Sequence, residues 1–501
     1  MKLKNTLSLL LVIALVASLG IVAIAEDLPE VTLKITVPGD RPADTEDLMA
    51  AIEEACDLNV KLNFVFYANA DISEKTRLSL ASGEDNDLIW HPGRVDYVFA
   101  VENGYFEPLD ELLDAYGQDL LANRPVTMWE NCRIDGQLYA IPMGVYNRIG
   151  RHFNVREDLR KELGFEPINS IDGLIEFAYA IKENYPELAP ITPGSYGGEQ
   201  YTSWATFLFD GFADRDYIHT TDVQRGSLML YFKNNDGIVY NLFDTEEPII
   251  FEAIDQARQL YNDGIIYSDV LSLTTYRDQI ALNKAAIIPF PEIIPESSQR
   301  NQLAANVAGG LIESVVWNEE LFNTQGTMTA NFKAWNHQSV AVVCKNKERA
   351  IQFLNWTQNK ENYDLSAYGV PGVHVELVGD NKFNNISAGM RNFGYAWVWS
   401  PTFDRVSSLA TDAEFTMDNW LRNGPVDDFL LAKNAPLLFK PGNVQDELAQ
   451  YAAIESQFYA PIFNGVVERA DVWDDFKAQA YDLTKVLQAE LQAQMDELYA
   501  E

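Results

Sequence analysis

The chain has 501 residues and carries 74 acidic against 37 basic side chains, which gives a formal net charge of −37. This imbalance argues against nucleic acid or an anionic membrane surface as a partner, because both are bound through clustered Lys and Arg. With 47% hydrophobic and 12% aromatic residues, the chain is long enough to fill more than one core. Its length predicts two or three folded units.

The N-terminus has the pattern of a secretory signal peptide. A basic start is followed by an almost wholly apolar run over residues 7–23, and small residues at Ala23 and Ala25 then mark a cleavage site. A transmembrane anchor is the alternative, but no basic stop-transfer flank follows the apolar run. We therefore expect a signal peptide over residues 1–25 and export of the mature chain.

Residues 31–90 alternate between strand and helix patterns. We expect strands over 31–37, 61–67 and 87–90, and helices over 45–55 and 73–81. Such alternation predicts a parallel sheet with right-handed crossovers, in which ligands bind beyond the carboxyl ends of the strands. The loops at 38–42, 67–70 and 90–94 should therefore face a common cleft.

The remaining elements continue without a linker. Asp135-Gly136 predicts a β-hairpin turn between apolar strands. Further expected elements are helices over 156–163, 170–184, 251–264 and 347–358, a strand over 340–343, and a nearly all-helical tail over 444–498. Because no repeat or low-complexity segment separates these elements, the domains should be interwoven.

The chain shows no catalytic or metal-binding motif. Its five histidines are far apart and lack the spacings of metal-binding helices, and neither a glycine-rich phosphate loop nor a Gly-x-Ser-x-Gly elbow is present. Cys56, Cys132 and Cys344 fit no metal-site spacing, and Cys56 and Cys344 are expected to be small buried residues. We therefore expect no enzymatic activity, no metal and no cofactor.

Tryptophans beside polar turns are the positive signal for a ligand. Trp90 ends a strand, Trp335 lies among polar residues, and Trp204 follows a glycine-rich loop. Trp397 and Trp399 are expected to alternate along a strand, so that only one of them faces a cleft. Flat aromatic faces beside placed polar groups suit sugar rings, and packing in the core is the alternative for each ring.

Several segments, taken in their order and spacing, resemble one known family. They are 80–89 (LASGEDNDLI), 106–110 (FEPLD), 134–142 (IDGQLYAIP), 153–165, 346–356 and 368–374 (YGVPGVH). The resemblance is to extracellular solute-binding proteins of family 1, the carbohydrate-type substrate-binding subunits of ABC importers. The tail from about Val444 resembles the helical extension of one branch. Many relatives carry a lipidated cysteine after the signal peptide, whereas this chain has Ala25-Glu26.

The resemblance implies a two-lobed α/β fold of type II, in which each lobe is a mixed sheet flanked by helices. The first lobe would comprise residues 26–142 and 331–378, and the second lobe 143–330 and 379–501. Hinge closure would be selected by a solute that touches both lobes.

The function that the resemblance implies is capture of a carbohydrate, an oligosaccharide, and its delivery to the permease of an ABC importer. The mature protein would be a monomer in the extracellular or periplasmic space, at the outer face of the cytoplasmic membrane. A peptide or another polar solute is an alternative ligand. A secreted glycoside hydrolase is an alternative function, which would need a buried pair of carboxylates.

We expect the ligand to be held by residues at the ends of strands and at the crossings between lobes. These candidates are Asp40, Arg41, Trp90 and Arg94 from the first lobe, Tyr146, Asn147 and Trp335 at the crossings, and Trp204, Phe290, Glu292 and Trp397 from the second lobe.

Overall fold

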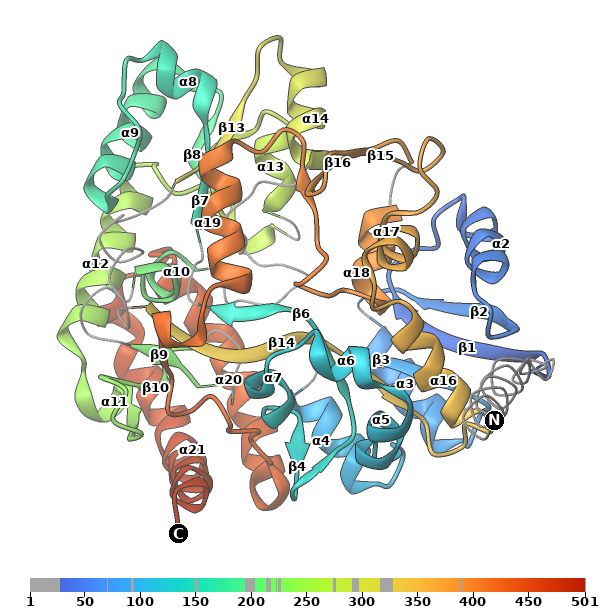
Figure 1. The fold of residues 1–501 in the computed structure, drawn as a ribbon. Helices are drawn as coiled ribbons and strands as arrows, with labels where there is room; N and C mark the ends of the chain where they lie inside the picture. The colour runs from blue at the N-terminus through green and yellow to red at the C-terminus, as the bar shows by residue number, and fades with distance from the viewer. Residues whose placement is uncertain are drawn as a thin grey trace, which may run out of the picture.

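The computed structural model describes residues 28–69, 71–91, 94–148, 152–193, 203–212, 218–221, 223, 227–273, 276–290, 297–315, 328–387 and 390–500. Within these ranges the chain folds into two larger sheets covered by helices (Figure 1), with the helical C-terminal segments along one flank. No helix in this part of the chain is long and apolar enough to cross a membrane. The expected signal peptide lies outside the described residues.

The larger sheet has six strands and mixed direction. Its strands are β1 (Val31–Pro38), β2 (Val60–Tyr67), β3 (Leu88–His91), β6 (Ile141–Arg148), β14 (Met328–Val340) and β18 (Phe429–Leu431). The order is β18-β14-β3-β1-β2, and β6 also pairs with β14. β1 runs parallel to β2 and β3, which confirms the parallel unit expected from the sequence, whereas β14 is antiparallel to β3.

The strand expected over residues 340–343 is wrong. β14 already ends at Val340, and the chain then turns, because the Cys344 amide donates to the Ala341 carbonyl at 3.0 Å. The residues of this apolar run do not share one environment, since Ala341 is buried while Val342 is 44% exposed. Cys56, Cys132 and Cys344 are all free and buried.

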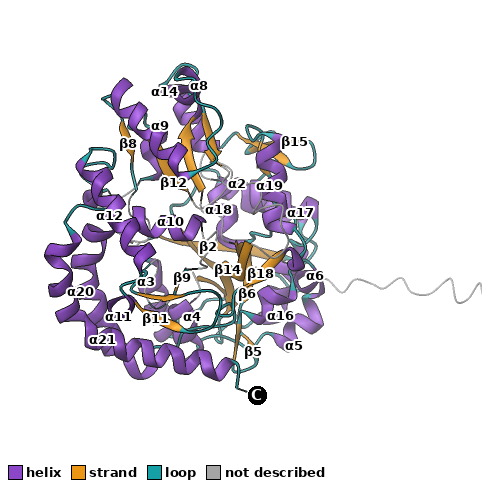
Figure 2. Ribbon diagram, turned by 90° about the vertical axis from the view of Figure 1, so that its left-hand side faces the viewer, coloured by secondary structure: helices purple, strands orange, loops and turns teal. Residues whose placement is uncertain are grey.

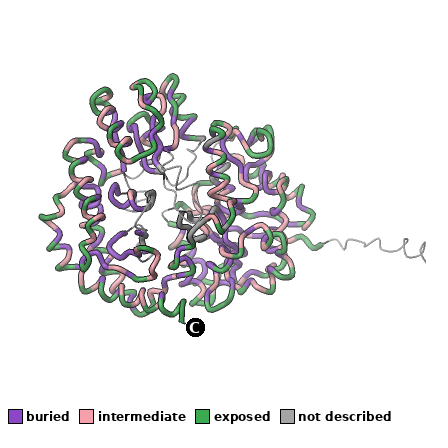
Figure 3. Tube along the Cα trace, turned by 60° about the vertical axis from the view of Figure 1, so that its left-hand side comes forward, coloured by how far each residue is buried: buried purple, intermediate pink, exposed green. Residues whose placement is uncertain are grey.

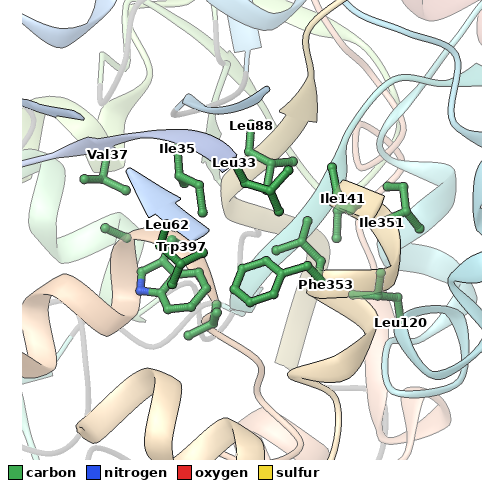
Figure 4. Packing of buried hydrophobic residues seen from close by; sticks show 14 of the residues in the cluster. Leu33, Ile35, Val37, Leu62, Leu88, Leu120, Ile141, Ile351, Phe353 and Trp397 are labelled. Atoms are coloured by element: carbon green, nitrogen blue, oxygen red, sulfur yellow. The ribbon is translucent and has the colours of Figure 1, made fainter. Parts of the chain in front are cut away.

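Helices cover the six-stranded sheet and fill its main core. They include α2 (Thr45–Ala55), α3 (Ile72–Ala81), α4 (Arg94–Glu102), α5 (Asp110–Tyr116), α6 (Gln118–Ala122), α7 (Val126–Glu130), α16 (Lys347–Trp356), α17 (Lys360–Tyr368) and α18 (Met390–Trp397). Figure 4 shows Leu33 and Ile35 of β1 packed towards Phe353 of α16 and Trp397 of α18. The expected hairpin is confirmed by β4 (Arg133–Ile134) and β5 (Gln137–Leu138), which are antiparallel.

The second of the two larger sheets has four strands. Its order is β13 (Ile312–Val315), β7 (His152–Arg156), β12 (Ala285–Phe290) and β8 (Ala189–Ile191). Around it lie α8 (Glu157–Glu162), α9 (Ile171–Asn184), α10 (Trp204–Phe212), α12 (Pro248–Asn262), α13 (Arg277–Ala281) and α14 (Ser297–Asn306). Its core is separate from the first and includes Phe153, Phe177 and Ile287.

The C-terminal tail is helical, as expected. It consists of α20 (Gln445–Phe463) and α21 (Arg469–Leu498), which lie side by side in Figure 2. Together they pack with β10 (Leu230–Phe232), β11 (Val239–Asn241) and α11 (Leu242–Thr245), and β9 (His219–Thr220) is the third strand of that small sheet. Gly465 turns the chain between the helices, where an added Cβ would lie 2.3 Å from the Ala257 backbone. Only glycine fits so close an approach.

The chain crosses between the two sheets more than once. β6 leads into β7, β14 follows β13 in the chain, and α19 (Asp412–Asn423) leads into β18. Residues between 379 and 410, which include β16 (Lys382–Asn385) and β17 (Val406–Ser407), differ from the expected division. Phe383, Phe393 and Val398 pack in the core of the six-stranded sheet rather than with the four-stranded sheet. The trace in Figure 3 shows buried residues on the inner sides of both parts.

Candidate ligand-binding site

The carboxyl ends of β1, β2 and β3 meet at one edge of the six-stranded sheet. Pro38 pairs with Tyr67 at the ends of β1 and β2, and Thr36 pairs with Ile89, which brings Trp90 beside the same edge. The three loops that the sequence places after these strands therefore start together. This edge is where parallel sheets bind ligands.

An aromatic cluster lies at this edge, formed by Tyr67, Ile72, Trp90, Met143, Tyr395 and Trp399. The rings of Tyr395 and Trp399 pack edge to face, with centroids 4.4 Å apart and planes at 70°. Gly144 of β6 lies directly under Trp399, has φ +91°, and donates its amide hydrogen to the Trp399 carbonyl at 2.9 Å. An added Cβ would lie 2.7 Å from the indole ring, so this contact requires glycine.

The indole of Trp399 is held by a buried carboxylate. Its Nε1 donates to Asp404 Oδ2 at 3.1 Å, and the Tyr368 hydroxyl donates to the other oxygen of Asp404. Arg422 Nη1 contacts Asp404 Oδ2 at 2.7 Å, and the Asp404 side chain is only 2% exposed. Charged hydrogen bonds of this kind are strong and directional, so the ring plane of Trp399 is fixed before any ligand arrives.

A small cavity of about 20 Å³, partly open to solvent, lies between α3 and α4 beside the aromatic cluster. Its lining residues are Ile72, Ser73, Thr76, Arg77, Leu80, Trp90, His91, Asp96, Phe99, Ala100, Tyr105 and Phe106. Trp90 Nε1 and Thr76 Oγ1 are buried there without a hydrogen-bond partner in the described part of the chain. Apolar walls with a few placed polar atoms are typical of small-molecule sites, but this cavity has room for only about one water molecule.

A row of buried polar side chains lies across the four-stranded sheet, near the carboxyl ends of β12 and β13. Asn154 of β7 is directly opposite Ser314 of β13, so their side chains share one face. Thr192 follows β8 and donates its backbone N–H to the Ile287 carbonyl at 3.1 Å. Among the described residues, neither amide atom of Asn154 nor the hydroxyls of Ser314 and Thr192 find a partner. We call these three residues the polar row.

The unpartnered atoms of the polar row need an explanation. Asn154 is 0% exposed, and a buried amide left without hydrogen bonds costs about 1–3 kcal/mol. Native proteins rarely leave such groups unsatisfied unless water, an ion or a ligand completes them. The polar row is therefore the second candidate for ligand contact. The strand pattern does not single it out, because Asn154 falls at a polar position of the alternating sequence of β7, His-Phe-Asn-Val-Arg.

The structure brings only part of the predicted site to the edge of the six-stranded sheet. Trp90 belongs to the aromatic cluster, while Asp40 and Arg41 are exposed beyond the end of β1. Arg41 is paired with Glu46, and its guanidinium lies 5.9 Å from the ring centroid of Phe66. The exposed pair is screened by water and contributes little to stability.

Several of the predicted site residues lie inside or at the ends of helices and strands. Arg94 begins α4, Phe290 ends β12, and Trp335 lies inside β14 rather than before a strand. Tyr146 and Asn147 lie in β6, where Tyr146 pairs with Ala334 of β14. Glu292 lies outside the described residues.

Two predicted tryptophans are core residues instead. Trp204 is 0% exposed and packs against Phe153, with its Nε1 donating to Gln256 Oε1 at 3.2 Å. Trp397 is also 0% exposed, and it ends the helix α18 rather than lying on a strand. Its ring centroid is 5.1 Å from that of Phe64 of β2. The helix turns Trp397 inwards, and the chain after α18 brings Trp399 to the aromatic cluster.

The described residues contain no group of three or more His, Cys, Asp or Glu side chains arranged to hold a metal ion.

The chain matches the family model of bacterial extracellular solute-binding proteins over residues 47–370. It is 23% identical over 481 residues to a carbohydrate ABC transporter substrate-binding protein of Streptococcus pneumoniae, a match that covers 93% of this chain and 90% of the relative.

Solved structures give the same fold. The N-glycan transport solute-binding protein of S. pneumoniae superposes with a TM-score of 0.74 at 19% identity, covering 93% of this chain and 98% of that one. Its complexes with Man1GlcNAc and Man5GlcNAc score 0.67 and 0.62. The substrate-binding protein FusA of S. pneumoniae with kestose scores 0.61 at 17% identity, covering 94% of this chain and 99% of that one. The chain therefore belongs to the bacterial extracellular solute-binding proteins, which bind solutes rather than transform them, and it has their two-lobed type II fold.

Proposed function

We propose that this protein captures an oligosaccharide between its two lobes and delivers it to the permease of an ABC importer. The aromatic cluster at the carboxyl edge of the six-stranded sheet carries the proposal, because the half-buried rings of Tyr67 and Tyr395, in the same cluster as Trp90 and Trp399, offer flat apolar faces to sugar rings. The polar row would supply the hydrogen bonds that sugar hydroxyls require. The carbohydrate-binding relatives support the same solute class.

Capture would proceed by hinge closure. We propose that the first lobe comprises residues 26–142, 331–378 and the segment 379–410, and that the second lobe comprises the four-stranded sheet and the C-terminal helices. The paired strands β6 and β14 would form the hinge, since they run between the lobes and their register shifts between Ala330 and Ala334 and again between Ala334 and Asn336. The three TM-scores for one relative, 0.74 to 0.62, support a family in which lobe arrangement varies.

The mature protein would act outside the cytoplasmic membrane as a monomer after cleavage following Ala25. Membership in an extracellular family supports this location. N-terminal sequencing of the secreted protein should give a chain that begins at Glu26. A mature product that retains residues 1–25 would contradict this part of the proposal.

Thermal unfolding across a glycan panel tests the ligand class. The panel would contain Man1GlcNAc, Man5GlcNAc, kestose and fructo-nystose. A ligand at 100 times its Kd stabilises the folded state by about 2.7 kcal/mol, so a cognate sugar should raise the Tm. Trp399→Phe should abolish the rise, whereas Trp356→Phe, in the same lobe but outside the aromatic cluster, should keep it. Peptides raising the Tm while every glycan fails would overturn the proposal, and so would repeated cleavage of the bound glycan.

A further inference from the structure

The N-terminal end of α19 contacts the part of the molecule that contains the four-stranded sheet, although the helix also packs on Val406 and Ala410 of the other part. Arg300 of α14 contacts Glu414 of α19 through Nη2 and Oε1 at 2.6 Å, and it also donates to the Leu409 carbonyl. Both charged side chains are buried, at 9% and 7% exposure. α14 itself packs on the four-stranded sheet through Leu303, which contacts the core that contains Ile288 and Ile312.

The C-terminal end of α19 is attached to the other half. Arg422 lies between two buried carboxylates, with Nε 2.6 Å from Asp418 Oδ2 and Nη1 2.7 Å from Asp404 Oδ2. Burial raises the pKa of Asp418, and Arg422 offsets part of that rise. Asp404 in turn accepts the indole hydrogen of Trp399. Buried polar contacts at the two ends of α19, joined by the helix itself, thus connect α14 with the aromatic cluster. Figure 1 shows α19 standing over β6 between the two halves.

We propose that α19 couples the arrangement of the two halves to the position of the Trp399 ring, with Arg422 and Asp404 as positioning residues. The inference rests on the proposed function in one respect, namely that Trp399 contacts the sugar. Breaking a buried ion pair by removing one partner costs about 3–5 kcal/mol, so neither end of α19 separates easily. The helix between Glu414 and Arg422 spans about 12 Å at 1.5 Å per residue and moves as a rigid body.

The coupling acts in both directions. A shift of α14 relative to the six-stranded sheet displaces α19, and Arg422 and Asp404 pass that displacement to the indole. By linkage, a sugar that stacks on Trp399 favours the arrangement of halves in which the ring is best placed. Closure is then driven partly by contacts on one lobe, before the polar row engages.

Fluorine NMR of the ligand-free protein, labelled with 5-fluorotryptophan, tests the coupling without any sugar. The Trp399 signal is assigned by its loss in Trp399→Phe. The test variant is the pair Arg300→Met and Glu414→Gln, which removes the ion pair but keeps a side chain that completes the N-terminal capping box of α19. We expect the Trp399 signal to move by more than its line width. The control Asp412→Asn, also on α19, removes an ion pair with Lys382 of β16 and should leave the signal in place.

A Trp399 signal that stays unmoved in the folded pair variant overturns the coupling. If the pair variant does not fold, Arg300→Lys replaces it, because it keeps the charge but loses the second hydrogen bond to Leu409. The affinity for Man1GlcNAc should also fall about fivefold or more in the pair variant and not in Asp412→Asn. Failure of the parent protein to bind any glycan of the panel contradicts the proposed function, while the fluorine signal still decides the coupling.

Discussion

The aromatic cluster and the polar row differ in how their buried polar atoms are hydrogen-bonded. In the aromatic cluster, the polar atom of Trp399 is bonded to Asp404, and its ring packs on Tyr395 and Gly144. In the polar row, the amide of Asn154 is buried with no partner among the described residues. Trp399 is fully hydrogen-bonded without a ligand, whereas Asn154 in the polar row and Trp90 in the same aromatic cluster each keep a buried polar atom without a partner among the described residues.

This difference indicates how binding free energy is divided between the lobes. A preformed aromatic surface loses little conformational entropy on binding, so stacking there contributes to affinity at once. The polar row gains more, because a ligand that supplies hydrogen bonds removes an existing desolvation cost. We therefore expect the sugar to dock first on the aromatic cluster and the polar row to favour the closed state. The predictions below test the two regions separately.

The largest effect should come from Gly394→Ala, which disturbs the helix packing that supports the aromatic cluster. Gly394 brings α18 against α17, and an added Cβ would lie 2.1 Å from the Ala367 carbonyl oxygen. Overpacking costs about 1–3 kcal/mol in cores and more where backbone must move, so we expect a loss above about 3 kcal/mol in urea unfolding. Gly372→Ala is the control, because an added Cβ there meets nothing within 4 Å, and the backbone φ of +79° alone costs about 1–2 kcal/mol. Equal losses for both variants would show that α18 can shift freely.

The second effect concerns Glu455 of α20, a buried carboxyl on the side of the four-stranded sheet. Burial raises its pKa to about 7, although Ser227 and Tyr451 donate hydrogen bonds to it. Because the unfolded chain ionises this group near pH 4.5, its favourable contribution is complete below that pH. The contribution is then lost as the pH rises through 7.

Glu455→Gln should therefore change the pH dependence of stability. The amide keeps an oxygen that accepts both hydrogen bonds but carries no charge. Above pH 7 the variant should be more stable than the parent by on the order of 3 kcal/mol, since the pKa rises from 4.5 to about 7. Near pH 4.5 the two proteins should unfold alike in urea. A stability difference that is the same at both pH values would contradict the assignment.

Asn154→Leu tests the polar row directly. Replacing an unpartnered buried amide by an apolar group of similar size should stabilise the ligand-free protein by about 1–3 kcal/mol and weaken glycan binding. Asn241→Leu is a matched control, because Asn241 is equally buried but bonds to Thr484 at 2.8 Å and to the Phe243 amide at 3.0 Å. The control should destabilise. If Asn154→Leu destabilises as well, the amide is already hydrogen-bonded in the ligand-free protein and is not free to bind a ligand.

The part of the site at the edge of the six-stranded sheet could be predicted, because the periodicity of a strand pattern indicates where the strand ends. Alternation over residues 31–90 located the carboxyl ends of β1, β2 and β3, and Trp90 followed from that rule. For Trp397 and Trp399 the sequence predicts a strand with only one ring facing the cleft, and Trp397 is the predicted contact. The α18 helix instead places Trp397 in the core, and its packing against Phe64 depends on a contact far away in sequence.

The polar row and the hydrogen bond of Trp399 could not be predicted from strand patterns. Nothing local to Asn154 or Ser314 indicates that their side chains stand opposite each other, since the register of β7 and β13 joins segments far apart in the chain. The same holds for the bond from Trp399 to Asp404, which depends on Arg422 from α19. Sequence patterns report burial, whereas hydrogen-bond partners between distant segments come only from the fold.

The smallest effect should come from Trp90→Phe, which changes one ring of the aromatic cluster and leaves the cluster packed. Trp90 is 9% exposed and lies against Met143 and Trp399, so truncation to Ala would open a cavity and confuse binding with unfolding. Phe keeps most of the apolar volume but loses the larger stacking face and the unpartnered indole N–H. We expect about tenfold weaker glycan binding, about 1.4 kcal/mol, with little change in the Tm of the ligand-free protein. Trp356→Phe, which changes a ring stacked on Phe353 outside the cluster, should leave binding unchanged. Unaltered binding in Trp90→Phe would confine the ligand to Trp399, Tyr395 and Tyr67, whereas a large fall in Tm would make Trp90 a structural residue of the α3–β3 junction.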